Sequence, residues 1–269
     1  IGFLYRPIRQ LMRTTGKIIG GIIFTVCLMS LVFSYSFAQM TEHDNMEPVF
    51  SEILEQRLAE QINENELTEL RKQLVLYCDQ IGSDTITLPY NNINLTINCS
   101  EIDKKSDKEV MHLISSTLFD SLYYKEYECE FVACIKNAIQ EGEQQDFLVL
   151  LSSTANDFFN KIALYLLIGV VAGLCLLIVS IRNVFGIVKS VGGSMIVAGL
   201  PLFGCYFFKT TLAEKTGSSV ANNMLEYVFG YLINPLMIIF GIGIVLAVVG
   251  FAGKKFFSEK DKHDAKKRK

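Results

Sequence analysis

Four long apolar runs constrain this chain more than any other feature of its sequence. They are Ile18–Phe37, Ile162–Ile181, Val191–Phe208 and Tyr227–Ala252, and none of them contains an ionisable side chain. A helix needs about 20 apolar residues to cross the hydrocarbon core of a bilayer. Hydrophobic residues make up 50% of the chain, which agrees with a membrane location. The sequence therefore predicts an α-helical integral membrane protein with four transmembrane helices.

Basic residues next to these runs predict how the protein is oriented. Because loops on the cytoplasmic side are enriched in Lys and Arg, the basic segments are assigned to the cytoplasm. We therefore expect a multi-pass protein of the cell (plasma) membrane with both termini cytoplasmic. The basic residues are Arg6, Arg9, Arg13 and Lys17 before the first run, Arg182 and Lys189 between the second and third, and the 8 Lys and Arg of residues 253–269.

The runs divide the chain into spans and connecting segments. In order these are a cytoplasmic basic N-terminus (1–17), transmembrane helix 1 (18–38), an acidic extracytoplasmic domain (39–160), transmembrane helix 2 (161–181), a cytoplasmic loop (182–190), transmembrane helix 3 (191–208), an extracytoplasmic loop (209–226), transmembrane helix 4 (227–252) and a basic cytoplasmic tail (253–269). A cleavable signal peptide is the alternative for the first run, because Ser36-Phe37-Ala38 resembles a cleavage site. An uncleaved signal anchor is preferred, since the run exceeds the ~7–15 apolar residues of a signal peptide.

The segment between the first two spans is acidic and is expected to form a mainly α-helical domain. Residues 39–160 contain 23 Asp and Glu against 8 Lys and Arg, so 8 − 23 gives a net charge of −15. Apolar spacing predicts helices, and strict alternation predicts one β-hairpin. Two helices are predicted between Met46 and Cys78, with a bend at 63–66, and a capping box of Asn63 and Glu66 starts the second of them. A hairpin follows from Thr85 to Cys99, with its turn at 89–92. The remaining predicted elements are a helix from Asp107 to Tyr124 that starts at the Ser106–Glu109 capping box, a helix from Tyr127 to about Gly142, and a single helix from Asp146 to Ile181 that joins the domain to the membrane.

Four cysteines of this domain are predicted to form two disulfides. Cys78, Cys99, Cys129 and Cys134 are an even number in an oxidising compartment. Of the three pairings, Cys129–Cys134 is disfavoured, because two positions five apart in one helix diverge too far for a bridge. We favour bridges that connect the hairpin or the first two helices to the 127–138 helix.

The spans contain their own small-residue and proline signals. Gly16–Gly20 and Gly169–Gly173 have the small-xxx-small spacing that lets helices approach closely. Pro201 and Pro235 are expected to kink the third and fourth spans. The three cysteines within spans are interpreted as small apolar packing residues, and they are Cys27, Cys175 and Cys205.

Two sequons and two acidic clusters are the motifs in the domain that suggest a ligand or a modification. Asn94 and Asn98 each begin an N-x-[ST] glycan acceptor on the polar face of the predicted strand, and glycosylation is left open because Cys99 in the second sequon competes through a disulfide. The two acidic clusters are interpreted as solvated surface, because the order of an EF-hand calcium loop is absent. They are His43 with Glu42, Asp44 and Glu47, and Glu101 with Asp103, Asp107 and Glu109.

The basic C-terminus has two interpretations. We prefer a polybasic segment that rests on anionic lipid of the inner leaflet. In a eukaryotic protein, Lys266-Lys267-Arg268-Lys269 would also resemble a dilysine retrieval signal to the endoplasmic reticulum, with lysines at the third and fourth positions from the end.

No catalytic motif was found, so the sequence favours a protein that binds over one that catalyses. The G-x-S-x-G, H-E-x-x-H, Walker A and G-x-G-x-x-G motifs are absent. We expect no enzyme activity, catalytic residue, cofactor, metal site or nucleic-acid partner. The first hypothesis is a membrane protein whose extracytoplasmic domain binds a protein, lipid or envelope partner. The alternative is an oligomeric channel or transporter with an acidic vestibule, for which Asn234 is the only strongly polar side chain deep in a span. Expected partners are membrane lipids and another membrane or envelope protein, and a homo-oligomer remains open.

Overall fold

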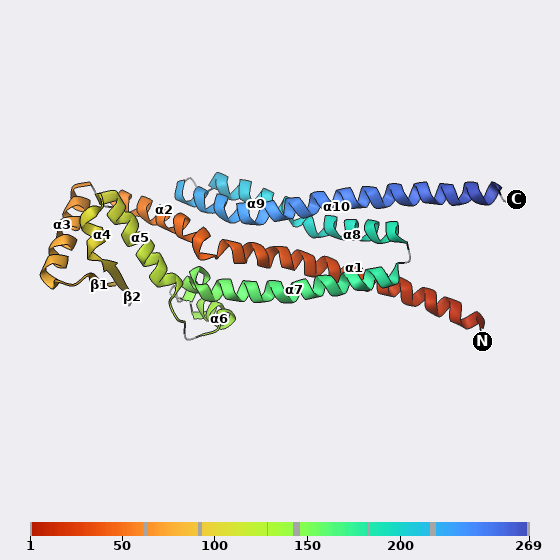
Figure 1. Cartoon of the computed structure of the whole chain (residues 1–269), viewed down its shortest axis with the longest axis horizontal. Coiled ribbons are helices and arrows are strands. Elements are labelled where there is room, and N and C mark those ends of the chain that lie inside the picture. The colour runs from red at the N-terminus through yellow and green to blue at the C-terminus, as the bar shows by residue number, and fades with distance from the viewer. Residues whose placement is uncertain are drawn as a thin grey trace. The chain divides into compact units, whose positions relative to one another are not determined.

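The computed structural model is helical apart from one two-stranded antiparallel sheet (Figure 1). It describes residues 2–61, 64–90, 93–127, 129–141, 146–181, 183–215 and 219–267. The elements are α1 (Gly2–Met40), α2 (His43–Gln61), α3 (Glu64–Ile81), β1 (Thr85–Tyr90), β2 (Ile93–Asn98), α4 (Cys99–Lys104), α5 (Asp107–Tyr123), α6 (Phe131–Glu141), the 3₁₀ helix η1 (Asp146–Leu151), α7 (Ser153–Ser180), α8 (Val184–Gly199), α9 (Pro201–Lys215) and α10 (Ser219–Lys267).

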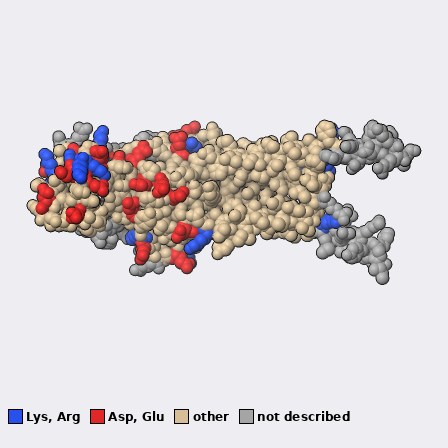
Figure 2. Space-filling model, in the orientation of Figure 1, with Lys and Arg blue, Asp and Glu red and all other residues tan. Residues whose placement is uncertain are grey.

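The chain forms two compact units. The membrane unit comprises Ile1–Phe37, Phe159–Gly217 and Val228–Lys269, and the disulfide unit comprises Ala38–Phe158 and Ser218–Tyr227. Figure 2 shows that charged side chains gather over the disulfide unit, whereas uncharged residues cover most of the visible surface of the spans.

Four helical segments of the described residues are long and apolar enough to cross a membrane, and they contain the four predicted runs except for Ile181, which directly follows the second segment. They are Arg13–Met40, Ser153–Ser180, Val184–Glu214 and Asn222–Phe256. The third is made of α8 and α9, with the boundary at Leu200 and Pro201 at the first position of α9. A proline ring lacks the N–H that a continuous helix requires, which explains why α8 ends before Pro201, and the kink expected there stays a prediction. Pro235, by contrast, lies inside α10, which continues through it.

Within the membrane unit, α1 and α7 are packed through glycines. A Cβ atom at Gly173 would lie 2.7 Å from the backbone nitrogen of Phe24, and one at Gly20 would lie 3.2 Å from the backbone nitrogen of Leu177. Such distances leave no room for a side chain. The close approach predicted for the Gly16–Gly20 and Gly169–Gly173 motifs is therefore confirmed, because only residues without a side chain let the two backbones come this near.

A second pair, α8 and α10, is packed in the same way. A Cβ atom at Gly243 would lie 2.8 Å from the backbone nitrogen of Ile196, and one at Gly192 would lie 2.8 Å from the carbonyl oxygen of Gly243. Figure 1 shows α8 and α9 running beside α10. The sequence did not single out these glycines.

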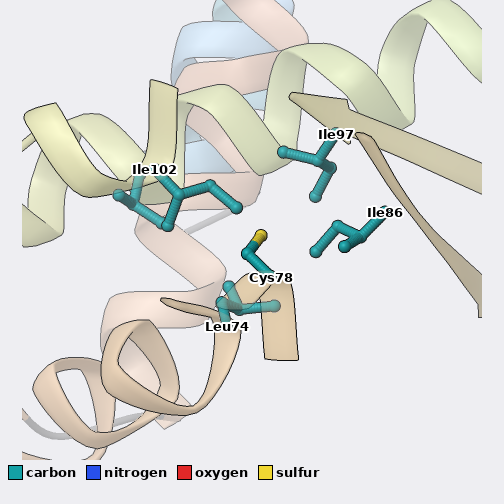
Figure 3. Packing of buried hydrophobic residues seen from close by; sticks show 6 residues of the cluster. Leu74, Cys78, Ile86, Ile97 and Ile102 are labelled. Atoms are coloured by element: carbon teal, nitrogen blue, oxygen red, sulfur yellow. The ribbon is translucent and has the colours of Figure 1, made fainter. Parts of the chain in front are cut away.

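The core of the disulfide unit lies where α3, the hairpin, α4 and α5 meet. Six buried residues contact one another there, and Figure 3 shows the side chains it labels pointing toward a common centre. Alternation along β2 explains its contribution, since Leu95 and Ile97 are buried while Thr96 and Asn98 are exposed. The cluster is Leu74, Cys78, Ile86, Ile97, Ile102 and Val110. A hairpin is marginal alone, and here α3 and α5 cover one face of it.

A second cluster joins α2 to α5. Met46, Phe119 and Tyr123 are buried together, with Phe50 packed against them.

The predicted start of α5 is confirmed, because the Glu109 carboxylate accepts hydrogen bonds from the backbone N–H and the hydroxyl of Ser106 at 2.7 and 2.6 Å.

The hairpin differs from the prediction at both ends. Pro89 and Tyr90 lie in β1, paired with Asn94 and Ile93, and not in the turn. Both strands of a two-stranded sheet are edges, so a proline is tolerated there although it donates no hydrogen bond. Positions 91 and 92 of the predicted turn lie outside the described residues. Cys99 begins α4 and does not end the strand.

Two predicted helix boundaries were wrong, and the predicted bend at 63–66 stays a prediction because it begins outside the described residues. Helix α6 begins at Phe131, not at Tyr127. The segment from Asp146 to Ile181 is not one helix, because η1 ends before Ser152 and α7 starts after it. The Ser152 hydroxyl donates to the carbonyl of Val149 at 2.6 Å, and its own carbonyl accepts from Ala155 N–H at 3.0 Å, so this residue closes one helix and starts the next. Residue 63 of the predicted capping box lies outside the described residues.

Candidate functional site

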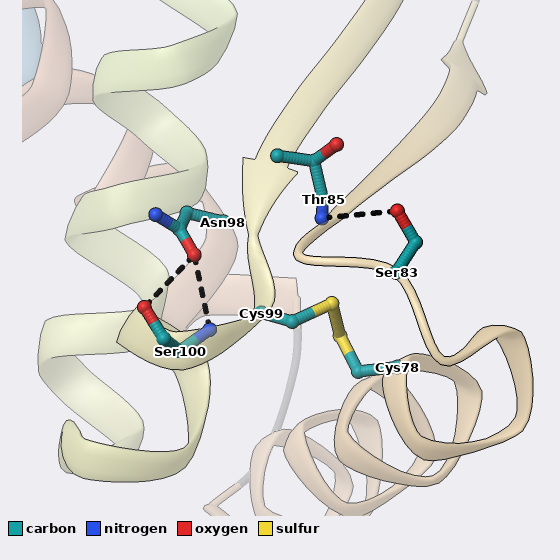
Figure 4. Close-up of a disulfide and its surroundings, with 6 residues drawn as sticks. All are labelled: Cys78, Ser83, Thr85, Asn98, Cys99 and Ser100. Carbon is teal, nitrogen blue, oxygen red and sulfur yellow. Dashed lines mark hydrogen bonds between the residues drawn. A yellow bond between two sulfur atoms is a disulfide. The ribbon is translucent and has the colours of Figure 1, made fainter.

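The candidate site surrounds the disulfide between α3 and α4 (Figure 4). Cys78 and Cys99 are bonded, with their Cα atoms 5.7 Å apart. Helix α3 ends at Gly82, which has a φ of 63° and donates its N–H to the carbonyl of Cys78 at 3.1 Å. This left-handed conformation suits glycine and turns the chain toward β1. The Cys99 N–H donates to the carbonyl of Asp84 at 2.9 Å, so the disulfide and this hydrogen bond fix the loop between them.

The second disulfide contradicts our preferred pairing. Cys129 is bonded to Cys134, with a Cα separation of 5.5 Å. The argument against this pair assumed that both residues lie in one helix, but α6 starts at Phe131, and Cys129 lies before it. Two disulfides are present, as predicted, but the favoured pairing was wrong, because neither bridge connects the hairpin or the first two helices to α6.

An acidic pocket of about 460 Å³ lies beside the first disulfide. Asp79 comes from α3, Asp84 from the loop that follows it, and Asp103 from α4. The hydroxyl-bearing residues Ser83 and Ser100 also line it, and none of the described lining residues is basic. All three aspartate residues are exposed, so the pocket presents negative charge to solvent.

Large apolar side chains are exposed on the same end of α3. The exposed fractions are 59% for Leu76, 45% for Tyr77 and 47% for Ile81. Asp79 lies between these residues in the sequence, which combines apolar and acidic groups on one segment. Scattered exposed apolar residues need no explanation. Three large apolar side chains exposed on one helix end, one of them aromatic, favour a protein-binding surface, because aromatic residues are enriched at interfaces. We call Leu76, Tyr77 and Ile81 with the pocket aspartates the α3 face.

A polar contact on the other side of the core holds α3 to α5. The Asp107 carboxylate accepts from the Thr68 hydroxyl at 2.7 Å and from the Arg71 guanidinium at 3.3 Å. The hydrogen bond from Thr68, together with Arg71, holds the pKa of Asp107 below its ordinary value. Arg71 also donates to the carbonyl of Asp103 at 3.2 Å, which positions the α4 end of the pocket.

Two histidines connect α2 to α5. The Nε2 atom of His43 lies 2.7 Å from Asp120, and its Nδ1 atom lies 3.2 Å from Asp44. His112 of α5 contacts Glu55 of α2 at 2.8 Å. Burial alone would lower the pKa of His43, but the hydrogen bonds to Asp120 and Asp44 outweigh it, and the pKa of His43 lies above its ordinary value. An imidazole donates from both nitrogens only when it is protonated, so these contacts favour the charged form.

The acidic clusters that resemble metal sites in sequence are used for other contacts. Of the first cluster, the structure brings His43 to Asp44 and to the distant Asp120. The second cluster does not converge on one point, because Glu101 pairs with Lys105 while Asp107 and Glu109 have the partners given above. Across the part of the chain that the structure describes, no group of three or more His, Cys, Asp or Glu is arranged to hold a metal ion.

The sequons have different surroundings. The Asn98 side chain is exposed, and its oxygen accepts from the backbone N–H and the hydroxyl of Ser100 at 3.1 and 2.9 Å. Cys99, between them, is in the disulfide. The side chain of Asn94 lies outside the described residues. Glycosylation at either position stays a prediction.

The residues singled out in the spans lie at different exposures. Cys27 contacts α7, where a Cβ atom at Gly169 would lie 2.6 Å from its sulfur, in agreement with the interpretation as a packing residue. Cys175 is exposed and Cys205 half-buried, and both are free thiols. Asn234 is exposed on α10.

Sequence reasoning missed the α3 face and the histidine contacts. His43 and Asp120 are 77 positions apart, and no local pattern joins them. The exposed apolar positions of α3 were assigned to no surface, because helical spacing alone does not say which side of a helix is covered. Cys78 was the sequence signal that could have located this face. The side of α3 that carries a disulfide cysteine points toward its partner element, so the remaining positions of α3 are left for solvent.

Comparison with known proteins finds no match to a protein-family model, to a curated protein or to a solved structure.

Proposed function

We propose that this chain is a non-enzymatic multi-pass membrane protein whose disulfide unit lies outside the cytoplasm and binds a partner protein through the α3 face. The observations that carry the proposal are the acidic pocket of Asp79, Asp84 and Asp103 and the large apolar side chains exposed on the same end of α3. The partner expected from this chemistry is a membrane or envelope protein that presents a Lys or Arg beside an apolar residue.

Physical arguments support a binding role for this face. Aromatic anchors flanked by charge are typical of binding hot spots. The net charge of −15 on residues 39–160 would speed the association of a basic partner. The Cys78–Cys99 disulfide and the hydrogen bond from Cys99 to Asp84 hold the pocket in one conformation, which reduces the entropy lost on binding.

Photo-crosslinking of the full-length protein in its native membrane tests the proposal. A photoreactive phenylalanine analogue at Tyr77 should give a discrete adduct that contains a second protein. The same analogue at Lys136, an exposed position on α6, is the control and should give none. Asp79→Asn combined with Asp84→Asn should weaken the Tyr77 adduct, and Glu126→Gln, which removes an exposed charge elsewhere, should not. Equal adducts from positions 77 and 136 would contradict the proposal.

The orientation is tested separately. We propose that both termini are cytoplasmic and that the protein resides in the cell membrane, on the basis of the Lys and Arg bias around the spans. A cysteine added beyond Lys269 should resist a membrane-impermeant maleimide in intact cells and react after lysis. The four disulfide cysteines should become reactive in intact cells only after reductant is added. Labelling of the added C-terminal cysteine in intact cells would reverse the orientation.

A homo-oligomeric channel or transporter is the second candidate, and Asn234 favours it. This amide is exposed on α10 within the Asn222–Phe256 span. A polar side chain at this depth is stabilised by a hydrogen bond to another helix, such as that of a second copy. Ion flux in proteoliposomes that is abolished by Asn234→Leu would support the channel, whereas absence of flux in the unmodified protein would refute it.

A further inference from the structure

A groove of about 610 Å³ lies in the membrane unit between α1 on one side and α8 and α10 on the other. It is distinct from the apolar cavity of about 490 Å³ lined by other residues of α1 together with α7 and α10. Unlike that cavity, the groove combines small residues, hydroxyl groups and basic side chains.

Adjacent glycine pairs create this groove. Gly20 packs against α7, but a Cβ atom at the neighbouring Gly21 would have nothing within 4 Å. Gly192 packs against α10, and the neighbouring Gly193 again has nothing within 4 Å. Gly21 and Gly193 both line the groove. One glycine of each pair therefore lets two helices touch, and the other leaves the space between the pairs unfilled.

Three lysines from three helices line this space, namely Lys17 of α1, Lys189 of α8 and Lys254 of α10. Among the described side chains of the membrane unit, Glu214 is the only carboxylate, and it does not line the groove. The Lys189 ammonium lies 5.1 Å from the centre of the Phe251 ring. Three positive charges with no carboxylate among the lining residues attract an anion.

The lysines border the apolar runs. Lys17 directly precedes the run that starts at Ile18, Lys189 precedes the run that starts at Val191 by two residues, and Lys254 follows the end of its run at Ala252 by two. A rise of about 1.5 Å per residue places all three within about 3 Å of the end of an apolar run, where the headgroup region of a bilayer begins. Ser190 and Ser194 line the groove one and five residues beyond Lys189 on α8. The first turn of α8 also carries the positive end of the helix dipole.

We propose that the groove binds one anionic phospholipid, with its phosphate between the three lysines and an acyl chain along the glycine-lined wall. Basic pockets between transmembrane helices bind anionic headgroups, whereas scattered lysines at span ends only interact with the surface as a whole. The space left by Gly21 and Gly193 distinguishes a site from such a surface. This binding does not depend on the partner proposed for the α3 face.

Native mass spectrometry of the full-length protein, titrated with phosphatidylglycerol or phosphatidylcholine in detergent, tests the proposal. One phosphatidylglycerol should bind more tightly than further copies, and phosphatidylcholine should bind at least tenfold more weakly. Lys254→Gln should weaken the first binding event about fivefold, and Lys255→Gln, the matched change at an adjacent residue that does not line the groove, should leave it unchanged. Gly193→Leu should weaken binding without altering charge, because its side chain would fill the open space.

The opposite results would overturn the proposal. Equal effects of Lys254→Gln and Lys255→Gln would show attraction to the whole basic surface and not a site. Unchanged affinity in Gly193→Leu would place the lipid elsewhere. A third arm adds inorganic phosphate, and displacement of the bound lipid by millimolar phosphate would show that the ligand is a soluble anion and not a lipid. Thermal unfolding of each variant without lipid, matched to the unmodified protein, establishes that a loss of binding is not a loss of folding.

Discussion

Replacing Gly243 by Ala should separate α8 from α10, whereas replacing Gly241 by Ala should not. Both glycines lie in α10 and neither lines the groove. At Gly243 the new methyl group would lie 2.8 Å from the backbone nitrogen of Ile196, 3.0 Å from the Cβ atom of Met195 and 3.1 Å from the carbonyl oxygen of Gly192. At Gly241 it would meet nothing within 4 Å.

The magnitude follows from these distances. Ordinary van der Waals contact begins near 3.4 Å, so 3.4 − 2.8 requires a shift of at least 0.6 Å, and backbone atoms on α8 cannot rotate away as a side chain would. Overpacking of this kind costs about 1–3 kcal/mol. Alanine in place of glycine also stabilises a helix by about 0.5–1 kcal/mol. Because both variants share that gain, we expect Gly243→Ala to be about 1–3 kcal/mol less stable than Gly241→Ala.

Equilibrium unfolding in mixed micelles with increasing SDS, followed by far-UV circular dichroism, measures this difference. The comparison between the two variants is more informative than either variant alone, since the gain in helix propensity cancels. If both variants unfolded at the same SDS fraction, the tight packing of α8 on α10 would be wrong.

Three further predictions concern the disulfide unit. Cys78→Ser should lower its free energy of unfolding by about 3 kcal/mol and Cys134→Ser by about 2 kcal/mol, because the bonded residues are 21 and 5 positions apart and a longer closed loop stabilises more; urea unfolding by near-UV circular dichroism compares them, and a larger loss for Cys134→Ser would contradict the loop argument. His43→Gln should flatten the dependence of the unit's stability on pH. Because the pKa of His43 is raised in the folded state, its stabilising contribution is complete below the unfolded pKa of about 6.5 and is lost as the pH rises through the folded pKa. Thermal melts between pH 6 and 8 should therefore show a smaller change of melting temperature with pH in the variant than in the unmodified protein. Thr68→Val should raise the pKa of Asp107 toward its ordinary value; that carboxylate stabilises above an unfolded pKa of about 3.9 and loses its effect as the pH falls through the lowered folded value, so the variant should show a shallower loss of stability in acid, and identical acid melts would count against the hydrogen bond.

Features with a local physical cause could be predicted from the sequence. The four spans follow from runs without ionisable residues, and the start of α5 follows from Ser106 and Glu109, three positions apart. The small-xxx-small motifs predicted where helices approach closely, although not that α1 and α7 are the helices that meet. The contact between α8 and α10 was missed because its glycines recur at a spacing of seven, at Gly192 and Gly199 and at Gly243 and Gly250.

Features that depend on distant residues could not be predicted. The pairing of Cys129 with Cys134 depended on where α6 begins, and a shift of four residues in that boundary reversed the conclusion. The α3 face could not be located until the side of α3 that contacts the hairpin was known. Once Cys78 and Leu74 point into the core, Leu76 must lie toward solvent, because it is two positions from each and two positions turn a helix by about 200°.

The same rotation explains how one dipeptide serves two purposes in the membrane unit. In Gly20-Gly21 and Gly192-Gly193 the first glycine faces a packed helix, so the second, turned by about 100°, faces away from it. A large side chain at Gly21 or Gly193 would fill the space between the helix pairs, and glycine leaves that space open. Tight packing within each helix pair and open space between the pairs are therefore consequences of the same sequence feature. This is why Gly193→Leu should weaken lipid binding while α8 remains packed on α10, whereas Gly192→Leu should disrupt both.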